Sequence, residues 1–351
     1  MKITLSSHRK NKPHDSQLGF GQFFTDHMYL LDFDLQNHWH NPRIIPYQPI
    51  ALDPAASVLH YGQALFEGMK AFRQDSGRVV MFRPDFNFER LQDGAERLCM
   101  QAPPPKLVTE GISELIRIDQ DWVPKSEGCS LYIRPTLIGV EPFLGVRPSN
   151  KYLFYTILSP VGSYYAEGIN PVKIWIEEEY IRAAPGGLGA TKAAANYASS
   201  LKAAVEAKKK GFAQVLWTDA REHAYFEEVG TMNVFFRMGS KIVTPKLNGS
   251  ILGGGVRDSV LKLLRKWDYS VEERPVSVAE VMNSIERGNL LEVFGTGTAA
   301  VISPVGEFGF RNQKIPINGG KMGELSQRLY KHISDIQRGR VEDEFNWVMP
   351  L

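Results

Sequence analysis

The sequence has little that would support a disulfide framework, a membrane span or a nucleic-acid surface. Its 351 residues include two cysteines, Cys99 and Cys129, too few to cross-link a fold of this size. No apolar run approaches the roughly 20 residues that cross a bilayer, and residues 1–15 lack the apolar core of a secretory signal. The formal net charge is +2 with dispersed basic residues. We therefore expect a cytoplasmic protein with neither nucleic acid nor membrane as a partner.

What is present is the composition of an ordinary globular protein, with 43% hydrophobic and 23% charged residues. The length favours two domains. Residues 1–161 mix helical and β-rich patterns and predict a small N-terminal α/β domain. The glycine-bounded polar stretch 162–171 is interpreted as a linker. Residues 172–351 are again mixed and predict a larger C-terminal domain, so the expected fold class is α+β.

Hydrophobic periodicity predicts the main elements. Helices are expected at residues 86–100, 107–123, 193–210, 256–267 and 277–288. Strands are expected at residues 129–140, 151–161 and 172–182, and again from residue 290. Residues 57–72 have the pattern of a strand, a turn and a second strand.

The stretch "GGLGATKAAANYASS" (186–200) places Lys192 between a glycine-rich loop and a predicted helix. A helix dipole disfavours positive charge at its N-terminus, and a partly dry site would lower the pKa of the amine further. A lysine with a lowered pKa is a nucleophile for Schiff-base chemistry with a carbonyl. The alternative is a surface lysine after a flexible turn, and the local sequence leaves both open.

Three further stretches combine small residues with polar groups. In "FEEVGTMNVFF" (226–236) two acids precede a turn, where one could pair with a protonated ring nitrogen or remain an exposed turn acid. In "LGGGVRDSV" (252–260) glycines open a helix, which forms either an anion site or a simple helix start. In "VFGTGTAAVISP" (293–304) a small-residue turn permits close backbone approach to a ligand. Arg134 lies in an apolar strand, where a buried arginine needs an anion or an internal salt bridge.

Together these groups fit an anionic cofactor with an aldehyde and a basic ring nitrogen, as in pyridoxal phosphate. Lysine would serve the aldehyde, an acid the ring nitrogen, and the helix start with arginine the phosphate. We predict no metal site. The alternative from another class is a non-enzymatic or nucleotide-binding module that uses "GGGVRDS". These glycines are not followed by the Lys-Ser/Thr of a Walker A loop.

Five stretches, in family order, resemble the branched-chain amino acid aminotransferases, which are fold-type-IV pyridoxal phosphate enzymes. They are "LHYGQALFEGMKAF", "LYIRPTLIGVEPFLGV", "GGLGATKAAANYASS", "EVGTMNVFF" and "FGTGTAAVISPV". The resemblance extends from about residue 20 to the C-terminus. It implies a C-terminal domain with a pseudo-barrel of strands flanked by helices. It also implies reversible transfer of the amino group of L-leucine, L-isoleucine or L-valine to 2-oxoglutarate, giving the branched 2-oxo acid and L-glutamate.

The alternatives within the same fold are a D-amino acid aminotransferase and an aminodeoxychorismate lyase. They share the lysine and the glutamate of this family. They lack, in our interpretation, the "LYIRPTLIG" and "LHYGQALFEG" stretches.

The resemblance assigns roles to particular residues. Lys192 would be the catalytic residue that links covalently to the cofactor and moves the substrate's α-proton. Tyr197 would hydrogen-bond the cofactor's phenolic oxygen, and Glu228 would pair with the pyridine nitrogen. The phosphate would be bound by Arg90, by backbone groups of Gly255 and Val256, and by the turn from Thr296 to Thr298. Thr231 would also bind the cofactor.

The substrate pocket is assigned in the same way. Its walls would be Tyr61, Phe66, Tyr132, Arg134 and Val146, with backbone N–H groups of Thr298 and Ala299 for the substrate carboxylate. The resemblance implies a homodimer in which Tyr132, Leu144 and Val146 reach the neighbouring subunit's site.

The sequence departs from the family pattern in two places. "LGGG" (252–255) stands where the family usually has Leu-Pro-Gly, so a rigid turn is lost while the N–H donors remain. Ala300 and Ser303 occupy the positions of the Cys-x-x-Cys found in the animal mitochondrial enzymes, so no redox switch is expected there.

Overall fold

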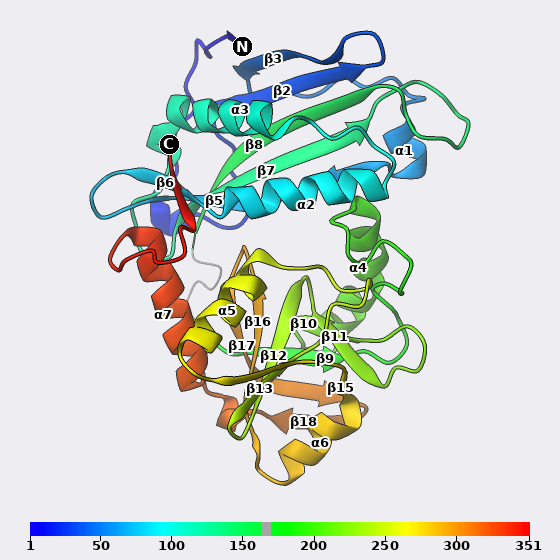
Figure 1. Cartoon of the computed structure of the whole chain (residues 1–351), viewed down its shortest axis with the longest axis vertical. Helices are drawn as coiled ribbons and strands as arrows, with labels where there is room; N and C mark the ends of the chain where they lie inside the picture. The colour runs from blue at the N-terminus through cyan, green and yellow to red at the C-terminus, as the bar shows by residue number, and fades with distance from the viewer. Residues whose placement is uncertain (163–169) are drawn as a thin grey trace. The chain divides into compact units, whose positions relative to one another are not determined.

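The computed structural model describes residues 1–162 and 170–351, which form two compact units. Within the described residues, unit 1 comprises 1–162, 191–195 and 335–351, and unit 2 comprises 170–190 and 196–334. Of the linker expected at 162–171, residues 163–169 lie outside the described part. Both units combine helices with a sheet, which confirms the α+β class (Figure 1).

Unit 1 is built on a nine-stranded sheet in the order β1-β3-β2-β8-β7-β5-β6-β19, with β4 paired to β7 beside this path. Neighbouring strands in the described residues are antiparallel, except for the parallel pair β1 and β3. The strands are β1 (Lys2–Ile3), β2 (His27–Asp34), β3 (His38–Pro46), β4 (Ala64–Phe66), β5 (Met69–Arg73), β6 (Val79–Phe82), β7 (Ser130–Gly139), β8 (Tyr152–Val161) and β19 (Val348–Pro350).

Helices cover one face of this sheet. They are α2 (Pro84–Arg97) and α3 (Pro105–Ile118), while the short α1 (Ser57–Tyr61) precedes β4 (Figure 1). Leu131, Ile133 and Leu137 of β7 join apolar residues of α2 and α3 in one buried cluster. Because side chains alternate along a strand, Tyr132 and Arg134 lie on the other face. The alternation of β7 thus separates a core face from a face that carries polar groups.

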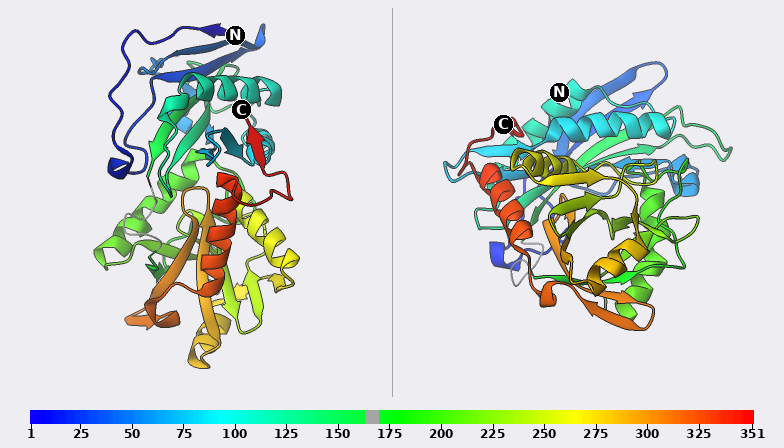
Figure 2. Two further views of the ribbon diagram at one scale, coloured as in Figure 1. Left: turned by 90° about the vertical axis from the view of Figure 1, so that its left-hand side faces the viewer. Right: turned by 60° about the horizontal axis from the view of Figure 1, so that its bottom comes forward.

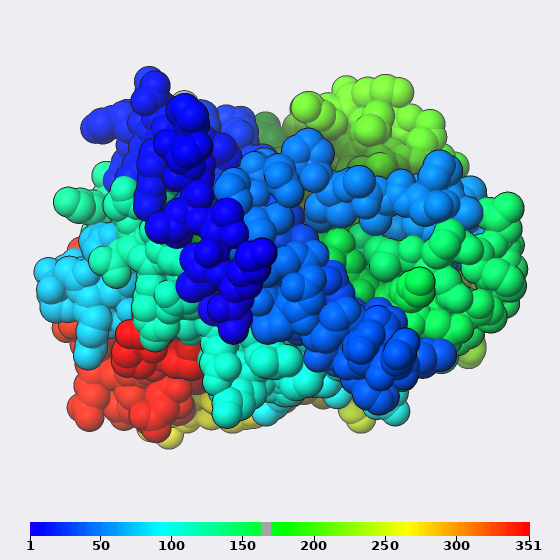
Figure 3. All heavy atoms as spheres, turned by 90° about the horizontal axis from the view of Figure 1, so that it is seen from above, coloured from blue at the N-terminus to red at the C-terminus, as the bar shows by residue number. Residues whose placement is uncertain are grey.

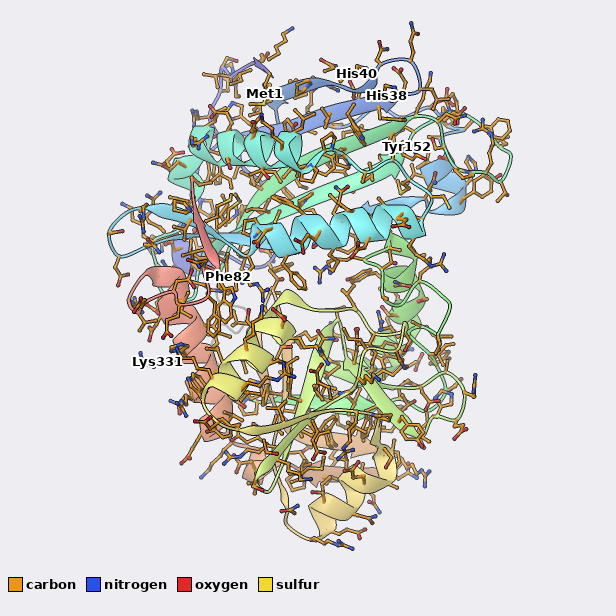
Figure 4. The ribbon with its side chains drawn as sticks, in the orientation of Figure 1. Met1, His38, His40, Phe82, Tyr152 and Lys331 are labelled. Carbon is orange, nitrogen blue, oxygen red and sulfur yellow. The ribbon has the colours of Figure 1, made fainter. Side chains whose placement is uncertain are left out.

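Both ends of the chain belong to unit 1. The N-terminal residues spread over the surface in Figure 3 (dark blue), and the Ser6 N–H donates to His27 Nε2 at 2.9 Å. At the other end β19 pairs with β6, with Val348 opposite Phe82, which is labelled in Figure 4. The rings of Trp347 and Phe82 pack edge to face, with their centres 5.9 Å apart. The C-terminal strand is therefore part of the unit 1 sheet and not a loose tail.

Unit 2 contains a closed ring of six strands. Pairing runs β11-β12-β16-β17-β9-β10 and returns from β10 to β11, so the ring has no open edge. This ring is the predicted pseudo-barrel. The ring belongs to a ten-stranded sheet, whose strands are β9 (Val172–Ile176), β10 (Gln214–Thr218), β11 (Tyr225–Val229), β12 (Met232–Met238), β13 (Lys241–Thr244), β14 (Ser270–Glu273), β15 (Val276–Ser277), β16 (Leu290–Gly297), β17 (Val301–Phe310) and β18 (Gln313–Pro316).

Four helices accompany the strands of unit 2. They are α4 (Ala194–Lys209), α5 (Gly255–Lys266), α6 (Val278–Glu286) and α7 (Glu324–Arg338), and the first residues of α4 and the last of α7 are grouped with unit 1. Ser277 caps α6, since its side chain accepts from the Glu280 N–H. Short 3-10 turns occur at Asp15–Gln17, Gln120–Trp122 and Asn318–Gly320.

Two expectations about local structure were wrong. Residues 57–61 form helix α1, and the strand begins only at Ala64. Strand β9 ends at Ile176, six residues short of the strand expected over 172–182. No helix within the described ranges is both long and apolar enough to span a membrane.

A buried carboxylate fixes the start of α7. Glu292 on β16 accepts hydrogen bonds from the N–H groups of Leu325 (3.1 Å) and Ser326 (3.0 Å), and pairs with Arg237 at 2.7 Å. Helix α7 (red) runs beside β16 and β17 (orange) in the left view of Figure 2. Glu292 therefore joins the ring to the helix N-terminus, where negative charge is favourable.

We expect Glu292→Ala to lower the free energy of unfolding by about 3 kcal/mol, because Arg237 loses its partner and the helix loses its cap. Urea denaturation followed by circular dichroism measures the effect. Glu206→Ala, at an exposed ion pair of α4, is the control and should leave the midpoint unchanged. Equal midpoints for the two variants would show that the carboxylate does not hold α7.

Candidate active site

Lys192 of unit 1 is tied by its backbone to strand β4. The Phe66 N–H donates to the Lys192 carbonyl at 3.2 Å, and Ala193 forms a β-bridge with Leu65. The Lys192 Nζ lies 4.9 Å from the centre of the Phe66 ring. Burial lowers the pKa of this amine and Arg90 adds to the effect, while Glu67 opposes it. The direction matches the expectation from the sequence, although burial, and not the helix dipole, is the leading cause.

Arg90 and Glu67 form a two-point ion pair close to Lys192. Arg90 Nε and Nη2 donate to the two oxygens of Glu67, each at 2.8 Å. Asn87 adds a hydrogen bond to the same carboxylate at 2.7 Å. Burial raises the pKa of Glu67, but Arg90 and Lys192 outweigh it and hold the pKa below its usual range. Glu67 is therefore a buried anion between two cations.

Tyr132 and Arg134 lie on the face of β7 opposite the helices. Arg134 Nη2 donates to the Tyr132 hydroxyl at 3.0 Å, and the guanidinium lies 4.6 Å from the centre of the Phe66 ring. That hydroxyl sits so close to Gly68 that a Cβ there would lie 2.1 Å from it. Arg134 has no salt bridge to any described residue, and its buried Nε has no hydrogen-bond partner there. The internal salt bridge considered as an alternative is absent within the described chain.

The other residues assigned to the substrate pocket of unit 1 lie on its surface. Tyr61 is 42% exposed and donates to the Leu144 carbonyl. Leu144 and Val146 are 63% and 85% exposed. Apolar side chains this exposed have room for a partner.

Glu228 of unit 2 is buried at the end of β11. The Leu252 N–H donates to its Oε1 at 2.7 Å, and Arg182 Nε lies 3.3 Å from its Oε2. The side chain is only 3% exposed. The structure therefore excludes the alternative of an exposed turn acid.

The loop after Leu252 leads into helix α5. Gly254 is the N-cap of α5, and Asn233 Nδ2 donates to the Leu252 carbonyl at 2.8 Å. A Cβ on Gly254 would lie 2.2 Å from Asn233 Oδ1, whereas one on Gly253 would only touch Leu247 at 3.5 Å. The backbone of Gly255 and Val256 forms the first turn of α5, where N–H groups and the helix dipole favour an anion.

The remaining assigned residues are also in unit 2. Thr296 on β16 is 1% exposed, and its Oγ1 has no hydrogen-bond partner among the described residues. Thr298 and Ala299 lie in the region where β16 turns to β17, and both are partly buried. Tyr197 is partly buried on α4. Thr231 is exposed in the turn between β11 and β12.

The groups of each unit, taken by themselves, suit parts of pyridoxal phosphate. Unit 1 offers an amine of lowered pKa and an arginine, which can receive an aldehyde and a phosphate. Unit 2 offers a buried carboxylate for a ring nitrogen, a helix start for an anion, and a buried hydroxyl that lacks a partner among the described residues. A buried hydroxyl without a partner is costly, so a ligand oxygen near Thr296 would remove that cost.

Comparison with known proteins gives the family. The sequence model of the amino-transferase class IV family matches residues 64–308. A branched-chain-amino-acid aminotransferase 2 of Bacillus subtilis (strain 168) is 52% identical over 347 residues, which cover 99% of this chain and 96% of that protein. The chain belongs to the branched-chain amino acid aminotransferases of class IV.

Solved aminotransferase structures share the fold. The Escherichia coli branched-chain amino acid aminotransferase superposes with a TM-score of 0.76 at 25% identity, covering 91% of this chain and 98% of that one. The enzyme of Thermobaculum terrenum, solved in its PLP form, gives a TM-score of 0.73 at 22% identity, covering 92% and 97%. The family and the transaminase class predicted from the sequence are thereby confirmed, and the alternatives within the same fold are not favoured.

Sequence reasoning missed several residues around the assigned groups of this aminotransferase. Glu67, to which Asn87 donates a hydrogen bond, pairs with Arg90, and Arg182 lies against Glu228. Glu67 directly follows Phe66 in "LFEGMKAF", and a charged residue inside that apolar run was the signal that could have revealed it. Arg182 carried no local signal, because its partners come from distant segments.

In this aminotransferase, Gly254→Ala should lower the free energy of unfolding by about 1–3 kcal/mol, since the new methyl group displaces Asn233 from the Leu252 carbonyl. Gly253→Ala is the matched control and should stay within about 0.5 kcal/mol of the parent protein. Thermal unfolding by calorimetry compares the two. Equal losses would mean that the contact with Asn233 is not what requires a glycine.

Proposed function

We propose that this chain is a pyridoxal phosphate-dependent transaminase that moves the amino group of L-leucine, L-isoleucine or L-valine to 2-oxoglutarate, reversibly, with L-glutamate as the product. The single observation that carries this is the partly buried Lys192 amine of lowered pKa, held on Phe66 in the unit that presents Tyr132 and Arg134. The relative at 52% identity supports the branched-chain substrates.

When bound, the cofactor's aldehyde and protonated ring would accept the amino group and delocalise the electrons left on the substrate's α-carbon. Lys192 Nζ would take the proton from the substrate's α-carbon as general base and deliver it to the cofactor's aldehyde carbon as general acid. Its lowered pKa keeps part of the population neutral, which the general-base role needs. Glu228 would hold the proton of the ring nitrogen, and Tyr197 would donate to the phenolic oxygen.

The phosphate would be held by charge and by backbone groups. Arg90 would provide the cation, while the first turn of α5 at Gly255 and Val256 would provide N–H donors. Thr296 and Thr298 would add hydroxyl groups, and the Thr296 hydroxyl is buried without a partner among the described residues. Thr231, which is exposed in its turn, would act through its backbone.

The two substrates differ in what they ask of the pocket. A branched side chain needs apolar walls, which Phe66 and Tyr61 would provide. The distal carboxylate of 2-oxoglutarate needs a cation, and Arg134 stands beside Tyr132 without a salt bridge to any described residue. Backbone N–H groups of Thr298 and Ala299 would receive the carboxylate common to both substrates. Because one methylene changes binding by only about 1–3 kcal/mol, leucine, isoleucine and valine should all react.

We further propose a cytoplasmic homodimer. Support for the dimer comes from a group of exposed apolar side chains in unit 1, namely Leu59, Tyr61, Phe143, Leu144 and Val146. Val146 and Leu144 would enter the neighbouring subunit's substrate pocket, whereas Tyr132, which is buried and accepts from Arg134, would line the pocket of its own chain. The two cysteines form no disulfide within the described chain, which suits a reducing compartment.

Lys192→Ala should lower transamination of L-leucine by at least about 10³-fold, because both the covalent attachment and the proton transfer are lost. Borohydride reduction followed by peptide mass spectrometry should find a pyridoxyl group on Lys192 in the parent protein and none in the variant. Lys202→Ala, an exposed lysine of α4, is the control and should keep both. A pyridoxyl group on another side chain, or none in the parent protein, would refute the proposal.

Arg134→Gln should raise the KM for 2-oxoglutarate by roughly tenfold or more, since a charged hydrogen bond contributes about 1.5–3 kcal/mol. The single-turnover rate with L-leucine should change by less than a few fold. Arg117→Gln, at an exposed position of α3, controls for the loss of a positive charge. An equal loss with both substrates would show that Arg134 supports the pocket as a whole and not the distal carboxylate.

A further inference from the structure

A second acid stands beside Glu228 and has no part in the proposed reaction. Glu227 precedes it on β11, so the two side chains point to opposite faces of the strand. Glu227 is 2% exposed, and its Oε2 is buried without a hydrogen-bond partner among the described residues. Its Oε1 is hydrogen-bonded to Ser250 Oγ. A carboxylate buried in this way would be costly in its ionised form.

The hydrogen-bond partners of Ser250 indicate the protonation state of Glu227. Ser250 Oγ is within hydrogen-bond distance of two acceptors, Glu227 Oε1 and, at 2.7 Å, Asn248 Oδ1. A hydroxyl has one hydrogen and can donate to only one of them. If Glu227 is protonated, it donates to Ser250 Oγ, which in turn donates to Asn248. With a neutral Glu227, both contacts of Ser250 Oγ are hydrogen bonds. With an ionised Glu227, one of the two contacts has no hydrogen.

Ser250 connects this chain of hydrogen bonds to Glu228. The Ser250 carbonyl accepts from Arg182 Nη2, which also donates to the Gly189 carbonyl at 3.0 Å. The Nε of the same arginine lies 3.3 Å from Glu228 Oε2. Two residues beyond Ser250, the Leu252 N–H donates to Glu228 Oε1 at 2.7 Å. Residues 248–252 thus hold both oxygens of Glu228, directly and through Arg182.

We propose that Glu227 is a positioning residue that, as a neutral carboxyl, fixes residues 248–252 through Ser250 and so sets the place of Glu228. This inference rests on the proposed function, in which Glu228 holds the cofactor's ring nitrogen. It adds a group that touches neither substrate nor cofactor. Its effect on the cofactor passes through Ser250, Arg182 and Leu252.

Electrostatics around Glu227 agree with a neutral group. Burial raises the pKa of Glu227, which outweighs the hydrogen bonds from Ser250 and Asn248 and the charge of Arg182, while Asp219 adds to the rise. A carboxyl whose pKa is raised by folding contributes stability below its unfolded pKa and loses it as the pH rises through its folded pKa. Ionised Glu227 would add a negative charge beside Glu228 and compete with it for Arg182.

The test compares Glu227→Gln and Glu227→Ala with the parent protein by titrating the full-length chain with pyridoxal phosphate between neutral and alkaline pH. A glutamine amide can donate to Ser250 Oγ as the neutral carboxyl does, so Glu227→Gln should bind within about threefold of the parent at neutral pH. Its affinity should not fall as the pH rises, whereas the parent's affinity should weaken as Glu227 ionises. Glu227→Ala should bind about tenfold more weakly.

Further variants separate positioning from a general loss of stability. Ser250→Ala should weaken binding like Glu227→Ala, and the double variant should be no weaker than either, because both break one chain of hydrogen bonds. If Glu227→Ala does not fold, Glu227→Gln and Ser250→Ala still carry the test. Glu179→Gln, at an exposed position of unit 2, controls for the loss of an acidic group.

Each outcome bears on the proposal. Weak binding by Glu227→Gln at neutral pH would show that the ionised form is needed and would overturn it. Parent-like binding by Glu227→Ala, with only a lower urea midpoint, would show a purely structural role and would also overturn it. A parent protein that fails to bind pyridoxal phosphate would refute the proposed function instead.

Discussion

The proposed chemistry of this chain depends on keeping an amine in a place where its charge is disfavoured. Lys192 is not isolated in an apolar cavity, because Glu67 lies near it and pulls its pKa up. Arg90 donates from Nε and Nη2 to both oxygens of Glu67, and this pairing limits how far Glu67 raises the pKa of Lys192. The Phe66 N–H donates to the Lys192 carbonyl and Ala193 bridges to Leu65, so the backbone on which the amine is carried is fixed beside β4. Burial, an anion and a cation are therefore balanced around one nitrogen atom.

Unit 2 also holds ionisable groups in buried surroundings, in this case two carboxyl groups. Two adjacent glutamates are buried at the end of β11, and repulsion would be severe if both were charged in the same surroundings. The strand turns them to opposite faces and gives them different partners. Glu228 receives a cation and a backbone N–H, whereas Glu227 receives a hydroxyl. The strand geometry thus allows one of the pair to stay ionised while its neighbour is neutral.

The sequence predicted the long helices and strands of this structure. Helical spacing gave α2 through Leu91 and Ala95, and alternation gave β7, because long elements contain several turns or pleats of signal. The five residues of α1 are too short for such a signal, and the helix was missed. Closure of the six-stranded ring depends on the pairing of β11 with β12 and β10, and it followed from the family resemblance alone.

The residues of the candidate site also differ in whether a local sequence pattern marks them. Lys192, Glu228 and the glycines before α5 stand in compact motifs and could be found in the sequence. Arg182 and Glu227 act through partners that are distant in the chain, so no local pattern marks what they do, whereas Glu67 was marked only as a charge inside an apolar run. The family is confirmed by comparison, while the role of each site residue stays a prediction.

The ion pair of Arg90 with Glu67 has a consequence for how an anion is received. A long arginine side chain ordinarily loses much rotamer freedom when a ligand immobilises it. Here Glu67, itself held by Asn87 and the Gly68 N–H, has already aligned the guanidinium plane. An arriving anion therefore meets a cation whose entropy was given up during folding, so little of the attraction is lost to ordering the receptor.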